Sequence, residues 1–451
     1  MILGTPIPLA QRKVTDPTVI TDATIVMEGP HDLGHLEAAA HAVCRAHEAL
    51  RTTVDLDLDR QLVHEFSPGA VGLRRHTAAP GRLMATVDER AKRPLDPAAL
   101  PVFRVEVVVE SPRLLAVHLA APHAVADFTS MEIVVRHFVT CYRDLTAGEE
   151  ARPPEVRRQF GDYRRRREAV LGDERTWLPG GIGARAADFW SARLAGAEPP
   201  AFGRVPPGGV QGDRMAFLRD RFDRDLLRRL EKVCGGARCS LFHAAIAAFE
   251  ETVARLTGND DVTTMCIVHG RGQPEFQDTV GMLTEEIAFR HRVRAPSRSA
   301  HLSALAVDAF ATYVHQNVPL SAVADRSPEV ARLYRRLHFR GMFLQYRPQR
   351  FGAGLESAVD GVTLDFPQDT RSMLASVMPG IALFNVDHAG DDLEVELIFD
   401  RRRWPAAEMA RLHGGFLSCL ASYALAPHEP VRIQSGMDGQ PADSAASSES
   451  K

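Results

Sequence analysis

The sequence predicts an α/β protein in which each of two halves forms a two-layer α+β sandwich. Amphipathic helical segments are interleaved with short strands rich in β-branched residues. Some neighbouring strands are close enough in sequence to form hairpins, which indicates mixed rather than purely parallel sheets. The chain of 451 residues is long enough for two domains that share an interface.

The first half opens with an amphipathic helix and contains a β-hairpin. Apolar residues recur at helical spacing from 33 to 50, and this run leads into a strand at Arg51-Thr52-Thr53. The stretches 102–109 and 114–121 are apolar and rich in valine, and a short polar segment separates them. They are therefore predicted to pair as a hairpin.

A short turn connects this hairpin to the next helix. The second strand ends at Pro122 and His123, and Thr129 or Ser130 is expected to cap the helix that follows. His123 and Asp127 are therefore predicted to lie together in a strand-to-helix turn.

A region rich in proline and glycine, residues 149–214, separates the two halves and holds one helical piece at 189–194. We accordingly predict an N-terminal lobe at 1–180, a C-terminal lobe at 181–434 and a disordered tail at 435–451, which is poor in apolar residues. In the second half, helices are expected at 223–233, 240–256, 301–313 and 405–424, and strands at 262–268, 342–346, 381–387 and 393–399.

Composition argues against several classes of protein. With 54 basic and 58 acidic residues, the chain lacks the positive field that nucleic-acid binding needs. It shows neither a secretory signal nor the ~18 consecutive apolar residues of a membrane span, which predicts a cytoplasmic protein without membrane or nucleic-acid partners. P-loop, GxSxG and HExxH motifs are absent, and the six cysteines have no CxxC spacing, which argues against P-loop kinases and ATPases, the commonest hydrolases and a cysteine-rich metal site.

The pattern with the clearest chemical meaning is His123 with Asp127. Histidine is the side chain best suited to move a proton near neutral pH, and a nearby carboxylate can orient its ring or organise the local backbone. His118 lies on the preceding strand, and His118, His123 and Asp127 form an alternative set of metal ligands for a metal hydrolase. That set lacks a fourth ligand at a recognisable spacing.

At these residues the sequence resembles a known family. LLAVHLAAPHAVADFTSMEIVVR, residues 114–136, resembles the HHxxxDG region of condensation domains from nonribosomal peptide synthetases and their stand-alone relatives. Three further matches follow in the family's order: RAHEALRTT at 45–53 resembles RHExLRT, DFWSARLAG at 188–196 resembles YWxxxLxG, and 256–290 resembles the segment with a GR dipeptide and a later GxFxNxxxxR. The chain is thereby similar to a stand-alone member.

The resemblance implies two chloramphenicol acetyltransferase-like lobes in a V, with a tunnel between them. His123 matches the histidine that orients or deprotonates an attacking amine or hydroxyl. Asp127 matches a structural acid that pairs with an arginine. Arg271 of the Gly-Arg dipeptide is the best match for that arginine, and Arg51 is a second possibility.

The sequence also departs from the family pattern. Pro122 replaces the first histidine, Phe128 replaces the glycine, and Glu285 stands where the later element usually has asparagine. We expect Pro122, Phe128, Ser130 and Glu285 along the substrate tunnel, with Ser130 acting as a helix cap rather than a nucleophile. The ring of Phe128 is expected to turn into the lobe core, because a large aromatic gains most by burial.

The resulting expectation is a condensation-type acyltransferase of natural-product biosynthesis. It would join an acyl group, presented as a thioester on the phosphopantetheine of a carrier protein, to an amine or alcohol that is free or carrier-bound. The resemblance implies no metal and no permanently bound cofactor. The alternative is a non-catalytic scaffold that recruits a modifying enzyme to a carrier-bound peptide. His123 with Asp127 favours the enzyme, whereas Pro122 and Phe128 favour the scaffold.

Overall fold

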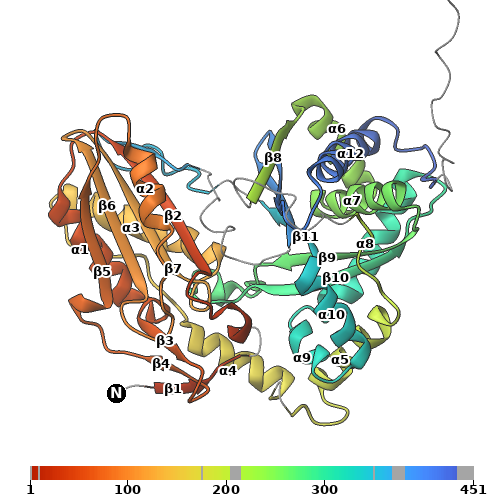
Figure 1. Ribbon diagram of the computed structural model, residues 1–451, viewed down its shortest axis with the longest axis horizontal. Helices are drawn as coiled ribbons and strands as arrows, with labels where there is room; N and C mark the ends of the chain where they lie inside the picture. The colour runs from red at the N-terminus through yellow and green to blue at the C-terminus, as the bar shows by residue number, and fades with distance from the viewer. Residues whose placement is uncertain are drawn as a thin grey trace, which may run out of the picture.

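The computed structural model describes residues 3–8, 11–173, 176–203, 215–348, 351–367 and 381–433; the predicted disordered tail at 435–451 lies outside this part. Figure 1 shows two lobes, one built from the N-terminal part of the chain and the other mainly from the C-terminal part. Each lobe combines helices with a β-sheet, so the predicted α/β class is confirmed.

The N-terminal lobe contains a five-stranded sheet. Its order is β12 (Thr363–Asp365), β2 (Ile20–Glu28), β7 (Leu114–Pro122), β6 (Phe103–Ser111) and β5 (Val71–Thr77). β6 and β7 pair antiparallel, as the predicted hairpin requires, while β5 and β6 are parallel. β12 comes from the second half of the chain and pairs with β2 across the lobes. The predicted boundary at residue 180 stays a prediction.

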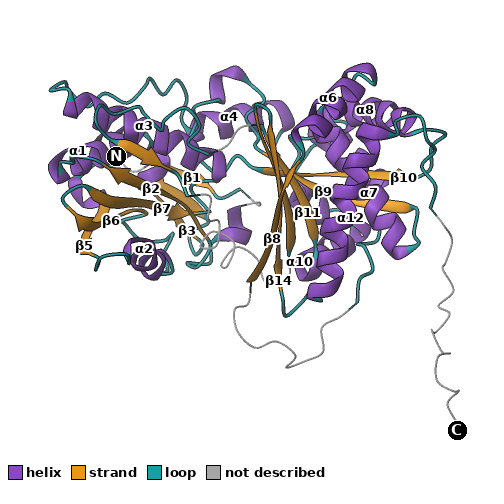
Figure 2. Ribbon diagram, turned by 90° about the horizontal axis from the view of Figure 1, so that it is seen from above, coloured by secondary structure: helices purple, strands orange, loops and turns teal. Residues whose placement is uncertain are grey.

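Helices cover both faces of this sheet. α1 (Leu33–Ala46) and α3 (Phe128–Thr146) pack on one face, and α2 (Leu83–Ala91) lies on the other, as Figure 2 shows. The remaining elements are α4 (Phe160–Leu171) and a small sheet of β1 (Leu3–Pro6), β4 (Arg60–Val63) and β3 (Thr52–Asp55).

The C-terminal lobe contains a six-stranded sheet in the order β10 (Glu285–Arg292), β9 (Asp261–Val268), β11 (Met342–Arg347), β13 (Ala382–Ala389), β14 (Asp392–Asp400) and β8 (Met215–Phe222). Its helices are α5 (Ile182–Leu194), α6 (Arg224–Gly236), α7 (Leu241–Thr257), α8 (Arg298–Val314), α9 (Leu320–Ala324), α10 (Pro328–Arg340) and α12 (Ala406–Leu425).

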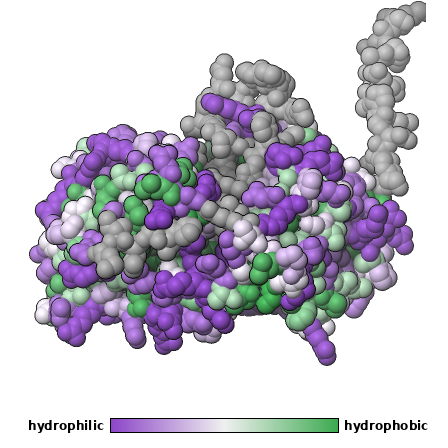
Figure 3. Space-filling model, turned by 90° about the horizontal axis from the view of Figure 1, so that it is seen from below, coloured by the Kyte–Doolittle hydropathy of each residue, from purple (hydrophilic) through white to green (hydrophobic). Residues whose placement is uncertain are grey.

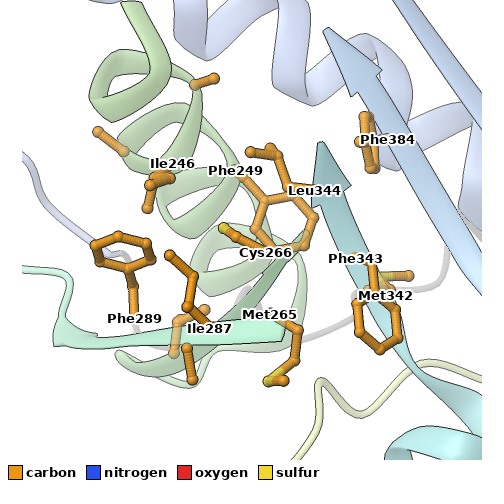
Figure 4. Packing of buried hydrophobic residues seen from close by; sticks show 14 of the residues in the cluster. Ile246, Phe249, Met265, Cys266, Ile287, Phe289, Met342, Phe343, Leu344 and Phe384 are labelled. Carbon is orange, nitrogen blue, oxygen red and sulfur yellow. The ribbon is translucent and has the colours of Figure 1, made fainter. Parts of the chain in front are cut away.

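The core of this lobe lies between α7 and the sheet. Ile246 and Phe249 of α7 face a layer that includes Cys266, Ile287 and Leu344 (Figure 4). These three residues come from adjacent strands and are paired in register, so they lie on one face of the sheet. This sheet holds the ends of β9 and β11, which border the candidate site.

The surface seen from below carries hydrophilic residues interspersed with smaller hydrophobic patches on both lobes (Figure 3). Within the described residues, no helix combines the length and the apolar composition needed to cross a membrane.

A partly buried polar network joins β10 to α7 and α8. His291 contacts both carboxylate oxygens of Glu250 at 2.9 and 3.0 Å through Nδ1, and Asp308 at 3.0 Å through Nε2. Burial alone would lower the pKa of His291, but the two carboxylates outweigh it and raise this pKa to about 10. The imidazolium is therefore the form that the fold stabilises.

This network predicts a pH-dependent contribution to stability. The pKa of His291 is higher in the folded state than the ~6.5 of an unfolded chain, so its contribution is complete below about pH 6.5 and is lost as the pH rises toward 10. The difference in unfolding free energy between the wild type and His291→Gln should therefore shrink between pH 6 and pH 10 in urea titrations. A difference that stays constant over this range would contradict the assignment.

Candidate functional site

The candidate site begins in the tight turn between β7 and α3. The carbonyl oxygen of Pro122, the last residue of β7, accepts hydrogen bonds from the backbone N–H groups of Val125 and Ala126 at 2.9 and 3.1 Å. The backbone N–H of His123 donates to the carbonyl oxygen of Val19 at 2.9 Å. These bonds fix the backbone on both sides of the His123 ring.

One nitrogen of the His123 ring is hydrogen-bonded, and the other has no partner within the described part of the chain. Nδ1 lies 3.0 Å from the carbonyl oxygen of Ala126 and 3.2 Å from the hydroxyl of Thr21, which itself donates to Ala126 at 2.9 Å. A carbonyl oxygen only accepts, so Nδ1 carries the proton in the neutral ring. Nε2 is then a lone-pair acceptor, and it has no hydrogen-bond partner among the described residues.

Asp127, rather than Thr129 or Ser130, caps α3, which corrects the predicted cap. Its Oδ1 accepts from the backbone N–H of Ser130 at 2.8 Å. The carboxylate also pairs with both terminal nitrogens of Arg271 at 2.9 and 2.8 Å, and their side chains are 0% and 1% exposed. The ion pair implied by the resemblance is thus present with Arg271, whereas Arg51 instead donates to the carbonyl oxygen of His64.

This ion pair links the two lobes. Burial would raise the pKa of Asp127, but the charge of Arg271 and the hydrogen bonds hold it below its ordinary value. Further donors are the backbone N–H groups of Leu283 and Thr284, at 2.9 and 3.1 Å. The turn after β7 is therefore fastened to the segment that precedes β10.

The backbone conformation at the Gly-Arg dipeptide requires a glycine. Gly270 has a φ of 68°, in the left-handed region that favours glycine. A Cβ at this position would overlap the carbonyl oxygen of Leu283. Gly270 thus lets the chain approach Leu283 closely enough for Arg271 to reach Asp127.

Two neighbouring cavities lie beside this turn. The larger, of about 600 Å³, is lined by α3 residues of one lobe and by the ends of β9 and β11 of the other. The smaller, of about 220 Å³, lies between the N-terminal segment, α4 and the start of β10. Tyr163 and Glu285 line both cavities and so form part of the wall between them.

Two of the four residues expected along the substrate tunnel line neither of these cavities. Pro122 and Ser130 are buried and line neither cavity. The Ser130 hydroxyl instead lies within hydrogen-bond distance of Asp127, Arg271 and both backbone groups of Gly281. Glu285 does face the cavities, where it is paired with Arg167 at 2.5 Å. His123 is half-buried and lines neither cavity.

The expected core orientation of Phe128 is wrong. Its half-buried side chain lines the larger cavity, with its ring centroid 5.6 Å from that of Phe351. The guanidinium carbon of Arg347, at the end of β11, lies 4.5 Å from the same ring centroid. Phe128 is the first residue of α3, where it faces the other lobe, and residues further along the helix, including Phe138, fill the core.

Phe128 and Phe138 provide a matched test of this orientation. Phe138 is 1% exposed on the same helix, so Phe138→Ala should lower the free energy of unfolding by about 3–5 kcal/mol. Phe128→Ala should cost less than half as much, because its ring borders a cavity. Equal losses of unfolding free energy for the two variants in denaturant titrations would show that the Phe128 ring is buried in the core after all.

The structure separates the three residues of the alternative metal site. His118 is 1% exposed, and its Nδ1 bonds to the Thr24 hydroxyl at 3.1 Å. Burial lowers the pKa of His118 to about 3. His123 and Asp127 have the separate partners described above, and the described part of the chain contains no cluster of three or more side chains suited to a metal ion. The donor set of the metal-hydrolase alternative is therefore not assembled.

The larger cavity is lined by several polar residues that were not anticipated from the sequence, among them Glu132 and His269. Glu132 lies one turn after Phe128 on α3, and His269 follows β9. Nδ1 of His269 accepts the backbone N–H of Arg271 at 3.1 Å, which leaves Nε2 as the donor in the neutral ring. The four-residue spacing from Phe128 to Glu132 was the available signal, because residues at i and i+4 share a helix face.

Comparison with known proteins identifies the family to which the chain belongs. The condensation domain family matches residues 17–438. One of the linear gramicidin synthase chains of Brevibacillus parabrevis is 28% identical over 309 residues, which cover 66% of this chain and 4% of that protein. The chain thus spans only a small part of this much longer relative.

Solved structures show the same fold. SgcC5 of Streptomyces globisporus, crystallised with a naphthyl ethanediol and sucrose, has a TM-score of 0.75 and 20% identity, over 94% of this chain and 100% of that one. The X-domain in complex with OxyB from teicoplanin biosynthesis has a TM-score of 0.77 and 18% identity, over 96% of both chains. With the match over 17–438, these findings show that the chain belongs to the condensation domain family of nonribosomal peptide synthesis.

Proposed function

We propose that the chain is an acyltransferase that joins a carrier-bound acyl thioester to an amine or alcohol, with His123 as the proton acceptor. The observation that carries the proposal is the state of the His123 ring. Its Nδ1 is held by Ala126 and Thr21, and its Nε2 has no hydrogen-bond partner among the described residues. An imidazole fixed in this tautomer is ready to accept a proton.

In the proposed reaction the acceptor nitrogen or oxygen attacks the thioester carbonyl carbon. Nε2 of His123 takes the proton that the acceptor loses, a C–N or C–O bond forms, and the C–S bond breaks as the carbonyl reforms. The phosphopantetheine thiolate leaves and recovers a proton from the imidazolium, so His123 ends in its starting state. Positioning of the two substrates supplies much of the remaining rate enhancement.

Asp127 and Arg271 act as positioning residues in this scheme. Their ion pair is buried and hydrogen-bonded to the backbone around it, so it holds the turn rather than exchanging protons with substrate. It fixes the turn relative to the other lobe. The His123 ring, four residues before Asp127, takes its position from the same turn.

The partners follow from the same proposal. The acyl donor is a carrier protein with a phosphopantetheine arm, and the acceptor is a small molecule or is carried by a second carrier protein. Membership of the condensation domain family supports this choice, and no cofactor bound by the chain itself enters the scheme. The naphthyl ethanediol recorded with SgcC5 supports an aromatic acceptor.

A second candidate function is a non-catalytic scaffold that recruits a partner enzyme. Phe128 occupies the border of the larger cavity, Pro122 replaces the first histidine of the motif, and His123 lines neither cavity. The X-domain with a similar fold was solved in complex with OxyB. In this alternative the Asp127–Arg271 pair keeps its structural role and His123 has no chemical one.

Intact-mass spectrometry of acyl-loaded carrier proteins separates the two functions. Incubation with the chain and a panel of amines and alcohols should return the carrier to its unacylated mass and yield an acylated acceptor. A carrier that binds the chain but keeps its acyl group with every acceptor would favour the scaffold.

A further inference from the structure

Among the described residues, the larger cavity contains one charged side chain without an ion-pair partner. Of its charged lining residues, Arg271 is paired with Asp127, Glu285 with Arg167, and Arg347 with Asp387. Glu132 has neither an ion pair nor a hydrogen bond within the described part of the chain. Glu132 is therefore the one charged lining residue whose carboxylate has no paired counter-charge within the described part of the chain.

The surroundings of Glu132 make this carboxylate costly to ionise alone. Its half-buried side chain projects from the second turn of α3. Burial raises the pKa of Glu132 to about 7, although the charges of Arg347 and Arg271 act in the opposite direction. A cation that entered the cavity would offset this desolvation cost and keep the carboxylate ionised.

The lining also includes aromatic surface, which suits an aromatic body next to that cation. Six aromatic rings border the cavity: Phe128, Tyr163, Phe242, Phe276, Tyr313 and Tyr346. In small-molecule sites, apolar and aromatic groups typically bury the body of the ligand, and a few polar groups fix its orientation. A volume of about 600 Å³ accommodates an aromatic amine.

We propose that Glu132 is the recognition residue for a protonated amine with an aromatic body, which binds in the larger cavity. This inference rests on the proposed function and refines it, since it gives the acceptor a cationic group in addition to the neutral amine or hydroxyl that attacks the thioester. Glu132 would contact the ammonium through a charge-assisted hydrogen bond. Its role is specificity, and it takes no part in the proton transfer assigned to His123.

Calorimetric titration with phenethylamine and phenethyl alcohol tests the proposal without acyl transfer. The two probes share an aromatic ring and a two-carbon chain, and only the amine is charged at pH 8. The wild type should bind the amine about 10-fold or more tightly than the alcohol. Glu132→Gln should weaken amine binding by about 10- to 100-fold and change alcohol binding by less than about twofold.

Glu275 provides the matched control. It is exposed, it lies between the lining residues Gln273 and Phe276, and it does not itself line the cavity. Glu275→Gln makes the same chemical change nearby and should leave both affinities unaltered. Equal affinity of the wild type for the two probes, or an unchanged preference in Glu132→Gln, would overturn the inference.

The pH dependence supplies a second readout. The charged groups that act on Glu132 are Arg347 of β11, Arg271 after β9, and Asp127 and Arg136, which precede and follow it along its own helix. Phenethylamine stays protonated from pH 8 to pH 6, whereas Glu132 becomes neutral over this range. Amine affinity should therefore fall as the pH is lowered in the wild type and stay flat in Glu132→Gln. A parallel fall in both proteins would contradict the assignment.

Failure of this inference is distinguishable from failure of the proposed function. His123→Asn should bind phenethylamine like the wild type, because His123 does not line the cavity. Glu132-dependent amine binding without any acyl transfer would support the amine site and contradict the proposed acyltransferase function. Acyl transfer to acceptors without any preference for a positive charge would support the acyltransferase function and contradict the role of Glu132.

Discussion

Arg271→Met should lower the free energy of unfolding by about 3–5 kcal/mol. Methionine keeps much of the length of the side chain but leaves the carboxylate of Asp127 buried without its counter-charge. The same change also removes the hydrogen bonds from Arg271 to the carbonyl oxygen of Thr279. Urea titration of the folded protein measures the effect.

Arg136→Met is the matched control, since Arg136 pairs with Asp278 and both side chains are nearly half exposed. Exposed ion pairs contribute about 0–1 kcal/mol, so this variant should remain close to the wild type. Asp127→Ala should likewise lower the melting temperature more than His123→Ala does. Similar losses for Arg271→Met and Arg136→Met would show that the buried pair does not hold the lobes together.

His123→Ala should lower the single-turnover rate of acyl transfer by about 10²- to 10⁴-fold, the usual contribution of a general base. The physical reason is the loss of the Nε2 lone pair, which no other described group at the turn replaces. The rate is measured by the loss of acyl mass from the carrier. A variant with nearly full activity would end the catalytic assignment of His123.

His123→Asn separates chemistry from loop structure. The asparagine amide can still donate to the carbonyl oxygen of Ala126, as Nδ1 does in the wild type, but it offers no basic nitrogen at the position of Nε2. This variant should therefore keep the wild-type melting temperature and lose activity as His123→Ala does. Recovery of activity in His123→Asn would assign the residue a positioning role only.

The sequence predicts much of the fold, because most elements carry local signals. The hairpin of β6 and β7 and the buried strands β9, β11, β13 and β14 have apolar runs that periodicity identifies. β10 was missed because its residues, EEIAFRHR, are largely charged. β12 has only three residues, and its pairing with β2 depends on a contact between segments far apart in the chain.

The site was predictable where a motif fixes it and less so where side-chain direction decides. His123, Asp127 and Arg271 were identified from spacing and resemblance, and the structure brings Asp127 and Arg271 together. The orientation of the Phe128 side chain was not predicted correctly, because helix periodicity does not decide which lobe a first-turn residue faces. The role of Glu132 depends on partners that only the tertiary structure shows.

The most direct test of the proposed function compares two histidines in one assay. Nε2 of His123 has no hydrogen-bond partner among the residues that the structure describes, whereas His269 lines the larger cavity with its Nδ1 bonded to the backbone N–H of Arg271. In single-turnover discharge of an acyl-loaded carrier, His123→Ala should lose about 10²- to 10⁴-fold and His269→Ala less than about tenfold. A large loss in His269→Ala with full activity in His123→Ala would contradict the account, as would an active wild type in which neither change matters.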